Sequence, residues 1–170
     1  MKGSISTAII VAFAALLLSA SAEAGLVDFY FTMAPNAEQV AGVEVESDGV
    51  GAGWLRLTTQ TNTIEWSIVY SALTGAPTMA HFHGPAEPGE NAGPQVTLDH
   101  TTNPIVGSTV ITDEQETQLV NNLWYVNIHT EAYPAGEIRG QLVRVIPEPA
   151  TAALLAGGAL ILLRTRHRRR

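Results

Sequence analysis

Three histidines are the residues of this sequence whose type and spacing could do chemistry. Residues 79–85 read Met-Ala-His-Phe-His-Gly-Pro, which places His81 and His83 two positions apart. On a β-strand, alternate side chains project from the same face, so both imidazoles would lie on one face and Phe82 on the other. A third histidine, His129, lies in a later run of alternating residues. Neutral imidazoles grouped in this way can bind Zn²⁺ or Cu²⁺.

Three interpretations of these histidines are open. The ring nitrogens could bond to the backbone, or to Glu137 and Asn127, and fix how the strands meet. They could instead bind zinc or copper, with Glu137 or Asp99 as an oxygen ligand. General acid–base catalysis is the third, but the sequence has no Gly-x-Ser-x-Gly, no Cys-His pairing and no phosphate-binding glycine loop. Imidazoles that converge within about 4 Å of one point, each with a hydrogen-bond acceptor behind it, would favour the metal interpretation. Ring nitrogens directed at separate backbone carbonyls would contradict it.

The elements that must position the histidines are β-strands. Apolar residues recur with a period near two and are interrupted by Gly, Pro and Asn, which predicts strands separated by turns. The clearest runs, which include two hairpins, are residues 27–32, 54–58 with 64–70, and 123–130 with 137–145. We expect seven or eight strands in one all-β domain, an antiparallel immunoglobulin-like sandwich or flattened barrel.

One short helix and several side-chain roles are also predicted. Thr112 as N-cap, with Gln115 three residues later, predicts a helix over residues 113–121. Arg139 is expected to form an ion pair with Glu137 on one strand face, and Asp99 with His100 is expected to face solvent. The tryptophans are expected in the core, namely Trp54, Trp66 and Trp124. A tryptophan that proved exposed would make carbohydrate binding a candidate function.

Three segments together resemble the signature blocks of the CHRD domain, a module named after chordin. They are residues 80–84 (Ala-His-Phe-His-Gly), 124–130 (Trp-Tyr-Val-Asn-Ile-His-Thr) and 136–142 (Gly-Glu-Ile-Arg-Gly-Gln-Leu). The likeness covers roughly residues 26–145. It implies an extracellular β-domain without an assigned enzymatic activity. The His-x-His spacing is also similar to that of copper-zinc superoxide dismutases, but a few residues do not imply that activity.

The N-terminus is typical of a signal peptide. Lys2 precedes an uncharged apolar run over residues 9–18, and small residues follow it. Cleavage is expected after Ala24, with Ala22 as the alternative. We therefore expect residues 1–24 to be a signal peptide, residues 25–146 the β-domain, and signal peptidase a partner.

The C-terminus resembles a PEP-CTERM sorting signal. Pro147, Glu148 and Pro149 precede an apolar stretch over residues 150–163. Its helical length of about 21 Å is short against a hydrocarbon core near 30 Å, so it would be a marginal permanent anchor. A cytoplasmic stop follows, made of Arg164, Arg166, Arg168, Arg169 and Arg170. The resemblance implies that residues 147–170 are recognised by an exosortase-type membrane protease, and that the protein reaches the cell envelope or extracellular matrix.

The charge of the central domain limits its partners. Residues 25–146 hold three basic and fourteen acidic residues, a net charge of −11, and the chain has no cysteine. Such a surface argues against nucleic acid, and no disulfide can support the core. We expect a non-enzymatic binding or structural domain that acts in adhesion or matrix assembly, with a polysaccharide or protein ligand. The alternative is a copper- or zinc-binding domain with weak oxidoreductase activity.

Overall fold

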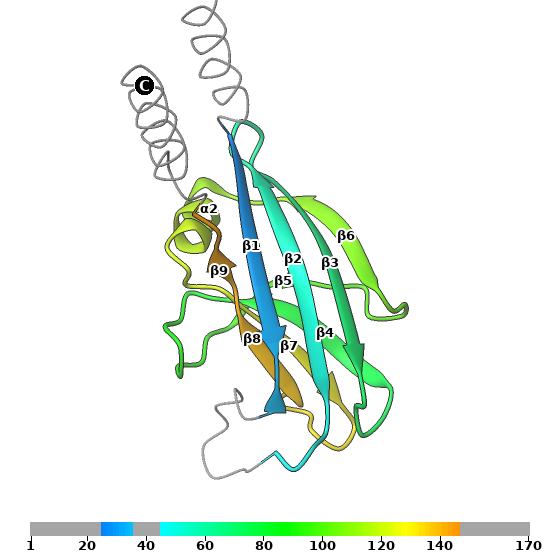
Figure 1. Cartoon of the computed structure of the whole chain (residues 1–170). Helices are drawn as coiled ribbons and strands as arrows, with labels where there is room; N and C mark the ends of the chain where they lie inside the picture. The colour runs from blue at the N-terminus through cyan, green and yellow to red at the C-terminus, as the bar shows by residue number, and fades with distance from the viewer. Residues whose placement is uncertain (1–24, 36–44, 147–170) are drawn as a thin grey trace, which may run out of the picture.

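The structure, a computed structural model, describes residues 25–35 and 45–146. These residues form two antiparallel sheets that pack face to face (Figure 1). The predicted all-β sandwich is confirmed. The predicted signal peptide with Ala24, the Pro-Glu-Pro motif and the arginine cluster lie outside the described residues, so these remain predictions.

The larger sheet has five strands in the order β6-β3-β2-β1-β9. Their bounds are Leu26–Met33 (β1), Val50–Thr58 (β2), Thr63–Ser71 (β3), Ile105–Val110 (β6) and Val143–Arg144 (β9). The smaller sheet has four strands in the order β5-β4-β7-β8. Their bounds are Pro77–His83 (β4), Pro94–Thr97 (β5), Tyr125–Thr130 (β7) and Ile138–Gln141 (β8). Within the described ranges the sandwich therefore has nine strands, slightly more than expected.

Both predicted hairpins are present, with one difference in the second. Strands β2 and β3 pair directly, and so do β7 and β8. The run over residues 137–145, expected as one strand, divides into β8 in one sheet and β9 in the other. Leu142 lies between them and is fully buried in the core. The chain crosses from the smaller sheet to the larger one at this residue.

Alternation along the strands builds the core between the sheets. Phe29, Leu55 and Phe82 are fully buried, and Phe82 packs edge-to-face on Trp66 with ring centroids 5.5 Å apart. Trp66 and Trp124 are buried as predicted. The prediction for Trp54 is wrong, because its side chain is 41% exposed. Its neighbours Leu55 and Leu57 fill the inward positions, so alternation turns Trp54 to the outer face.

The predicted helix is present as α2 (Asp113–Val120). The Thr112 hydroxyl accepts a bond from the Gln115 backbone N–H, and the Gln115 side chain accepts one from the Thr112 N–H. This reciprocal capping box satisfies two amide donors that the first helical turn leaves without partners. Leu119 anchors the helix in the core. Among the described residues, no helix has the length and apolar character needed to cross a membrane.

The first and last strands of the sandwich are neighbours at one edge of the larger sheet. Phe29 pairs with Arg144, and Tyr30 pairs with Val143, in antiparallel register. Beyond this register, the Val145 N–H donates to the Asp28 carbonyl oxygen over 2.7 Å. The start of β1 and the end of β9 therefore lie at the same end of the sandwich (Figure 1).

Candidate metal centre

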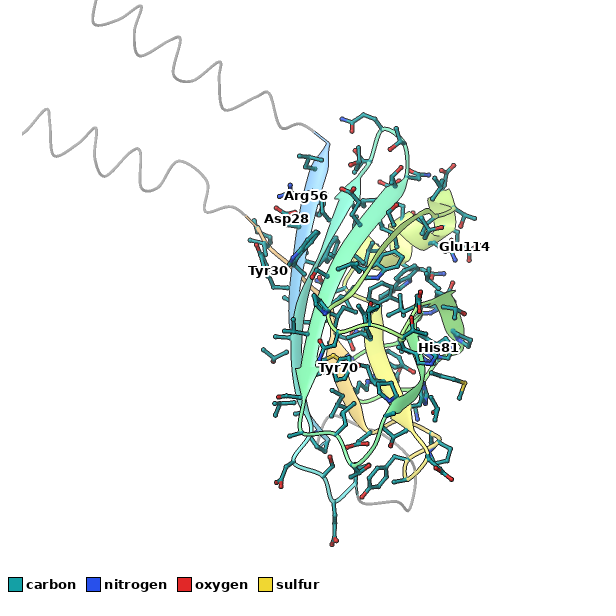
Figure 2. The ribbon with its side chains drawn as sticks, turned by 90° about the vertical axis from the view of Figure 1, so that its right-hand side faces the viewer. Asp28, Tyr30, Arg56, Tyr70, His81 and Glu114 are labelled. Atoms are coloured by element: carbon teal, nitrogen blue, oxygen red, sulfur yellow. The ribbon has the colours of Figure 1, made fainter. Side chains whose placement is uncertain are left out.

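All three histidines lie on the outer face of the smaller sheet. Strand β4 carries His81 and His83, and the adjacent β7 carries His129. His81 is the register partner of Asn127, and His83 that of Tyr125. Phe82, between His81 and His83, and Ile128, just before His129, point the other way and are in the core. The imidazoles of two neighbouring strands therefore lie on one face, as the His-x-His spacing predicts. Figure 2 shows His81 on the side of the smaller sheet.

The three rings converge. One nitrogen from each of His81, His83 and His129 can be chosen so that all lie within 4.8 Å of one another. Within this group, His81 Nδ1 and His129 Nε2 are 3.4 Å apart. Two nitrogens bound to one tetrahedral zinc ion are about 3.3 Å apart, given a Zn–N bond near 2.0–2.1 Å. The His81–His129 pair already has this separation, and one nitrogen of His83 lies within 4.8 Å of the other two.

Backbone carbonyls fix the protonation of two of the rings. His83 Nδ1 lies 2.9 Å from the Ala92 carbonyl oxygen, and His129 Nδ1 lies 3.0 Å from that of Pro134. A carbonyl oxygen only accepts hydrogen bonds, so both Nδ1 atoms donate and the neutral rings carry their lone pairs on Nε2. Nε2 of His83 is buried and has no hydrogen-bond partner in the described part of the chain. Two Nδ1 atoms are therefore directed at separate backbone carbonyls, while Nε2 of His129 faces His81.

Burial keeps the histidines neutral. Burial lowers the pKa of His83 and of His129 below the ordinary value of 6.5, and it outweighs the opposite effect of the two carbonyl bonds. Burial also lowers the pKa of His81, with a further contribution from His100. Arg139 adds to the lowering at His83. A neutral imidazole is the form that binds a metal ion, so all three rings are in the binding form at neutral pH.

A stack of three planar groups supports His83 from one side. The His83 ring lies 4.9 Å from the Tyr125 ring at an interplanar angle of 10°, and the Arg139 guanidinium lies 3.5 Å from the centre of the Tyr125 ring. Arg139 also donates to Asn91 Oδ1 and to the Glu90 carbonyl oxygen. The Tyr125 hydroxyl reaches the same Ala92 carbonyl as His83. The stack therefore ties the loop before β5 to the histidine site.

The CHRD family model matches residues 29–142, more than half of the chain. The chain belongs to the CHRD family. The matched range includes the three histidines, Tyr125 and Arg139. We found no match among curated proteins or among solved structures. CHRD is a non-enzymatic domain family, which indicates a binding or structural domain.

Glu137 does not join the histidines in this CHRD domain. Its fully buried carboxylate accepts bonds from the Ser47 hydroxyl, the Thr74 N–H and hydroxyl, and the Thr130 hydroxyl. Burial raises the pKa of Glu137, but these four bonds together outweigh burial and hold the pKa below its ordinary value. Of the acidic and histidine residues that the structure describes, only the three histidines form a metal-sized group. The predicted role of Glu137 as a ligand is not supported by this geometry.

The predicted ion pair between Glu137 and Arg139 is also wrong. The one ion pair of the CHRD domain within residues 25–35 and 45–146 joins Arg56 and Asp28. Glu137 precedes β8 and faces Ser47 and Thr74, whereas Arg139 reaches the loop before β5. The two residues share strand parity, but each has its own tertiary partners.

Asp99 is exposed, as predicted, and stands apart from the group. It accepts bonds from the Thr101 N–H and hydroxyl, and these bonds hold its pKa below the ordinary value. His100 is half-buried rather than solvent-facing. It is close enough for its charge to lower the pKa of His81. His100 is therefore a histidine close to His81 that lies outside the three-histidine group.

The arrangement suits metal binding better than acid–base catalysis. Three imidazoles converge, two of them are oriented by backbone carbonyls, and no nucleophile is part of the group. Sequence reasoning missed Tyr125 and the carbonyl partners Ala92 and Pro134. Alternation of Tyr125 with Asn127 and His129 is the signal that could have placed Tyr125 on the histidine face. The carbonyl partners depend on loop conformation and leave no such signal.

Proposed function

We propose that the CHRD domain is a non-enzymatic binding module that holds one zinc or copper ion at His81, His83 and His129. The observation that carries the proposal is the buried Nε2 of His83, which has no hydrogen-bond partner in the described structure and belongs to a ring of the three-histidine group. A buried polar atom normally has a hydrogen-bond partner or a ligand. A metal ion would supply that ligand.

The donor set agrees with this proposal. Imidazole suits both zinc and copper, and copper binds such ligands more tightly in general. A protein usually orients a metal-binding histidine through a hydrogen bond from the ring nitrogen that does not bind the metal. His83 and His129 each make such a bond, from Nδ1 to a backbone carbonyl oxygen. His81 Nδ1, which now faces His129 Nε2, would turn to the metal with its proton on Nε2. Three protein ligands leave one position for water.

Such an ion would act as a cross-link. The metal would join β4 to β7 through His83 and His129, and their carbonyl partners would extend the link to Ala92 and Pro134. These loops frame the outer face of the smaller sheet. We infer that this cross-link would fix the shape of a binding surface outside the cell.

Metal analysis of the purified full-length chain tests the proposal. After treatment with a chelator, the wild-type protein is dialysed against Zn²⁺ or Cu²⁺ and its bound metal is measured. We expect one ion per chain, and none in the H81A/H83A variant. His100→Ala is the matched control, because it removes a neighbouring histidine outside the group and should keep the ion. Equal metal content in the wild-type protein and the double variant would overturn the proposal.

We also propose that the protein is exported and sorted to the cell envelope or matrix. The resemblance of the N-terminus to a signal peptide and of residues 147–170 to a PEP-CTERM segment supports this route. Signal peptidase and an exosortase-type protease would be the processing partners, with transient membrane insertion of the apolar C-terminal stretch. Replacing Pro147, Glu148 and Pro149 by alanine should leave an unprocessed form in the membrane fraction. Unchanged processing would contradict exosortase recognition.

A further inference from the structure

The outer face of the larger sheet presents two aromatic side chains to solvent. Tyr30 on β1 and Trp54 on β2 are register partners, and they are 57% and 41% exposed. They lie on the face of the sandwich opposite to the histidines, as the labelled positions of Tyr30 and His81 in Figure 2 show. Large aromatic side chains in a small domain are mostly buried, so an adjacent exposed pair marks a binding surface.

A fixed carboxylate lies next to this aromatic pair. Asp28 and Arg56 are register partners two residues away on the same strands. Arg56 Nε donates to Asp28 Oδ1 over 2.7 Å and a terminal guanidinium nitrogen donates to Oδ2 over 3.0 Å. This two-point contact holds the carboxylate in one orientation, and each oxygen has a second lone pair. Asp28, Tyr30, Trp54 and Arg56 together line a hollow of about 170 Å³.

The hollow continues past Tyr30. A second, wider hollow of about 600 Å³ is lined by Tyr30 and by residues that include Thr32, Ala52, Gly53 and Val143. The small side chain of Ala52, which is exposed and pairs with Thr32, leaves the outer surface low beside the tyrosine ring. Both hollows are lined in part by Tyr30, so they adjoin at its ring, and two adjoining hollows suit an extended chain better than a compact small molecule.

We propose that these adjoining hollows bind a neutral polysaccharide. The C–H face of a sugar ring packs on the electron-rich face of an aromatic ring, and Trp54 and Tyr30 offer two such surfaces. Sugar hydroxyls donate hydrogen bonds, and the Asp28 carboxylate accepts them in a fixed direction. A few oriented polar groups among aromatic side chains are the common composition of a ligand site. The net charge of −11 over residues 25–146 disfavours an anionic polysaccharide.

This proposal is independent of the metal centre. None of the four residues that line the smaller hollow contributes to the histidine group. Loss of metal from the histidines should therefore leave sugar binding unchanged, and the two proposals can fail separately.

Affinity electrophoresis of the full-length chain tests polysaccharide binding. The native gel contains a soluble β-1,3-glucan, a β-1,4-glucan, a galactan or, as the anionic comparison, alginate. We expect at least one neutral polysaccharide to retard the wild-type protein. Trp54→Ala and Tyr30→Ala should each weaken that binding by roughly tenfold or more, as truncation of an aromatic anchor does. Val69→Ala is the matched control, because Val69 is exposed on the same sheet, at β3, and lines neither hollow.

Thermal unfolding of each variant shows whether it is folded, and Asp28→Asn gives a second test that keeps the aromatic pair intact. Asp28→Asn should also weaken retardation. The proposal is overturned if none of the three neutral polysaccharides retards the wild-type protein, or if alginate alone does. It is also overturned if folded Trp54→Ala binds as tightly as the wild-type protein. A change in oligomeric state in place of sugar binding would assign the face to self-association instead.

Discussion

Removing the Glu137 carboxylate should weaken the fold more than the loss of any exposed charge. The side chain is fully buried and accepts four hydrogen bonds, from Ser47, Thr74 and Thr130. Ser47 is distant from Glu137 in sequence and so is Thr74, with separations of 90 and 63 residues. The carboxylate therefore holds together three segments at one end of the sandwich.

The size of the effect follows from those four bonds. A hydrogen bond to a charged group contributes about 1.5–3 kcal/mol, but such contributions do not add fully. In Glu137→Ala the hydroxyl donors can rotate to other acceptors, whereas the Thr74 N–H cannot. We expect a loss of about 3–5 kcal/mol in the free energy of unfolding. For a domain of this size that corresponds to a fall in Tm of roughly 10–20 °C. Glu137→Gln keeps the shape and one oxygen and should cost about 1–2 kcal/mol.

The same carboxylate predicts a pH dependence. Its pKa in the folded protein lies below the ordinary value of 4.5. As the pH falls below about 5, the unfolded chain therefore takes up this proton before the folded chain does. The stabilisation by Glu137 is complete at neutral pH and is lost as the pH falls through the folded pKa. Glu137→Gln lacks this contribution, so its stability should fall less between pH 5 and pH 3.

Urea unfolding of the full-length chain, with a chelator present, measures both effects. Glu131→Gln is the control, because Glu131 is an exposed glutamate in the same hairpin and should change stability little. The reasoning fails if Glu137→Ala unfolds within about 1 kcal/mol of the wild-type protein, well below the expected loss. It also fails if the wild-type protein and Glu137→Gln lose stability in parallel as the pH is lowered.

Three further predictions concern the metal centre, the helix and the stack. Zinc at a hundredfold excess over its Kd should stabilise the wild-type protein by about 2.7 kcal/mol and leave H81A/H83A unchanged in thermal unfolding. This gain should disappear in acid, since protons compete for imidazoles whose pKa values lie below 6.5. Thr112→Ala should cost about 1 kcal/mol by urea unfolding, and Thr112→Ser much less. Arg139→Lys should lose the planar contact with Tyr125 and cost about 1–2 kcal/mol.

Local patterns were enough to predict the strands and the shared face of the histidines. Alternation around Phe82 placed His81 and His83 together, and the adjacent run placed His129 on a second strand. The capping box at Thr112 is likewise a local signal. Each of these depends on residues that are close in sequence, which is why one sequence was sufficient.

The wrong predictions have two causes: hydrogen-bond partners that are distant in sequence, and a strand alternation that was given less weight than residue type. Glu137 was predicted beside the histidines, but its donors come from residues 47 and 74, and only the packing of the two sheets brings them near. Trp54 was placed in the core because of its type. Trp54 is two residues from the charged Arg56, so both side chains project from the same face of the strand. Leu55 and Leu57 fill the inward positions, so that face is the outer one. Residue type outweighed alternation in that prediction.

Because β1 and β9 are neighbours, the two ends of the domain are close together, which determines how it can be attached to other domains or to a membrane. Because residue 25 and residue 146 leave from one end, attachments at both termini occupy the same pole of the sandwich. The same proximity permits circular permutation, with the old ends joined by a short linker and new ends opened in the turn between β2 and β3. That turn lies beside the start of β1, since Leu26 pairs with Thr58, so a permuted chain would present the same two faces from the same end of the sandwich.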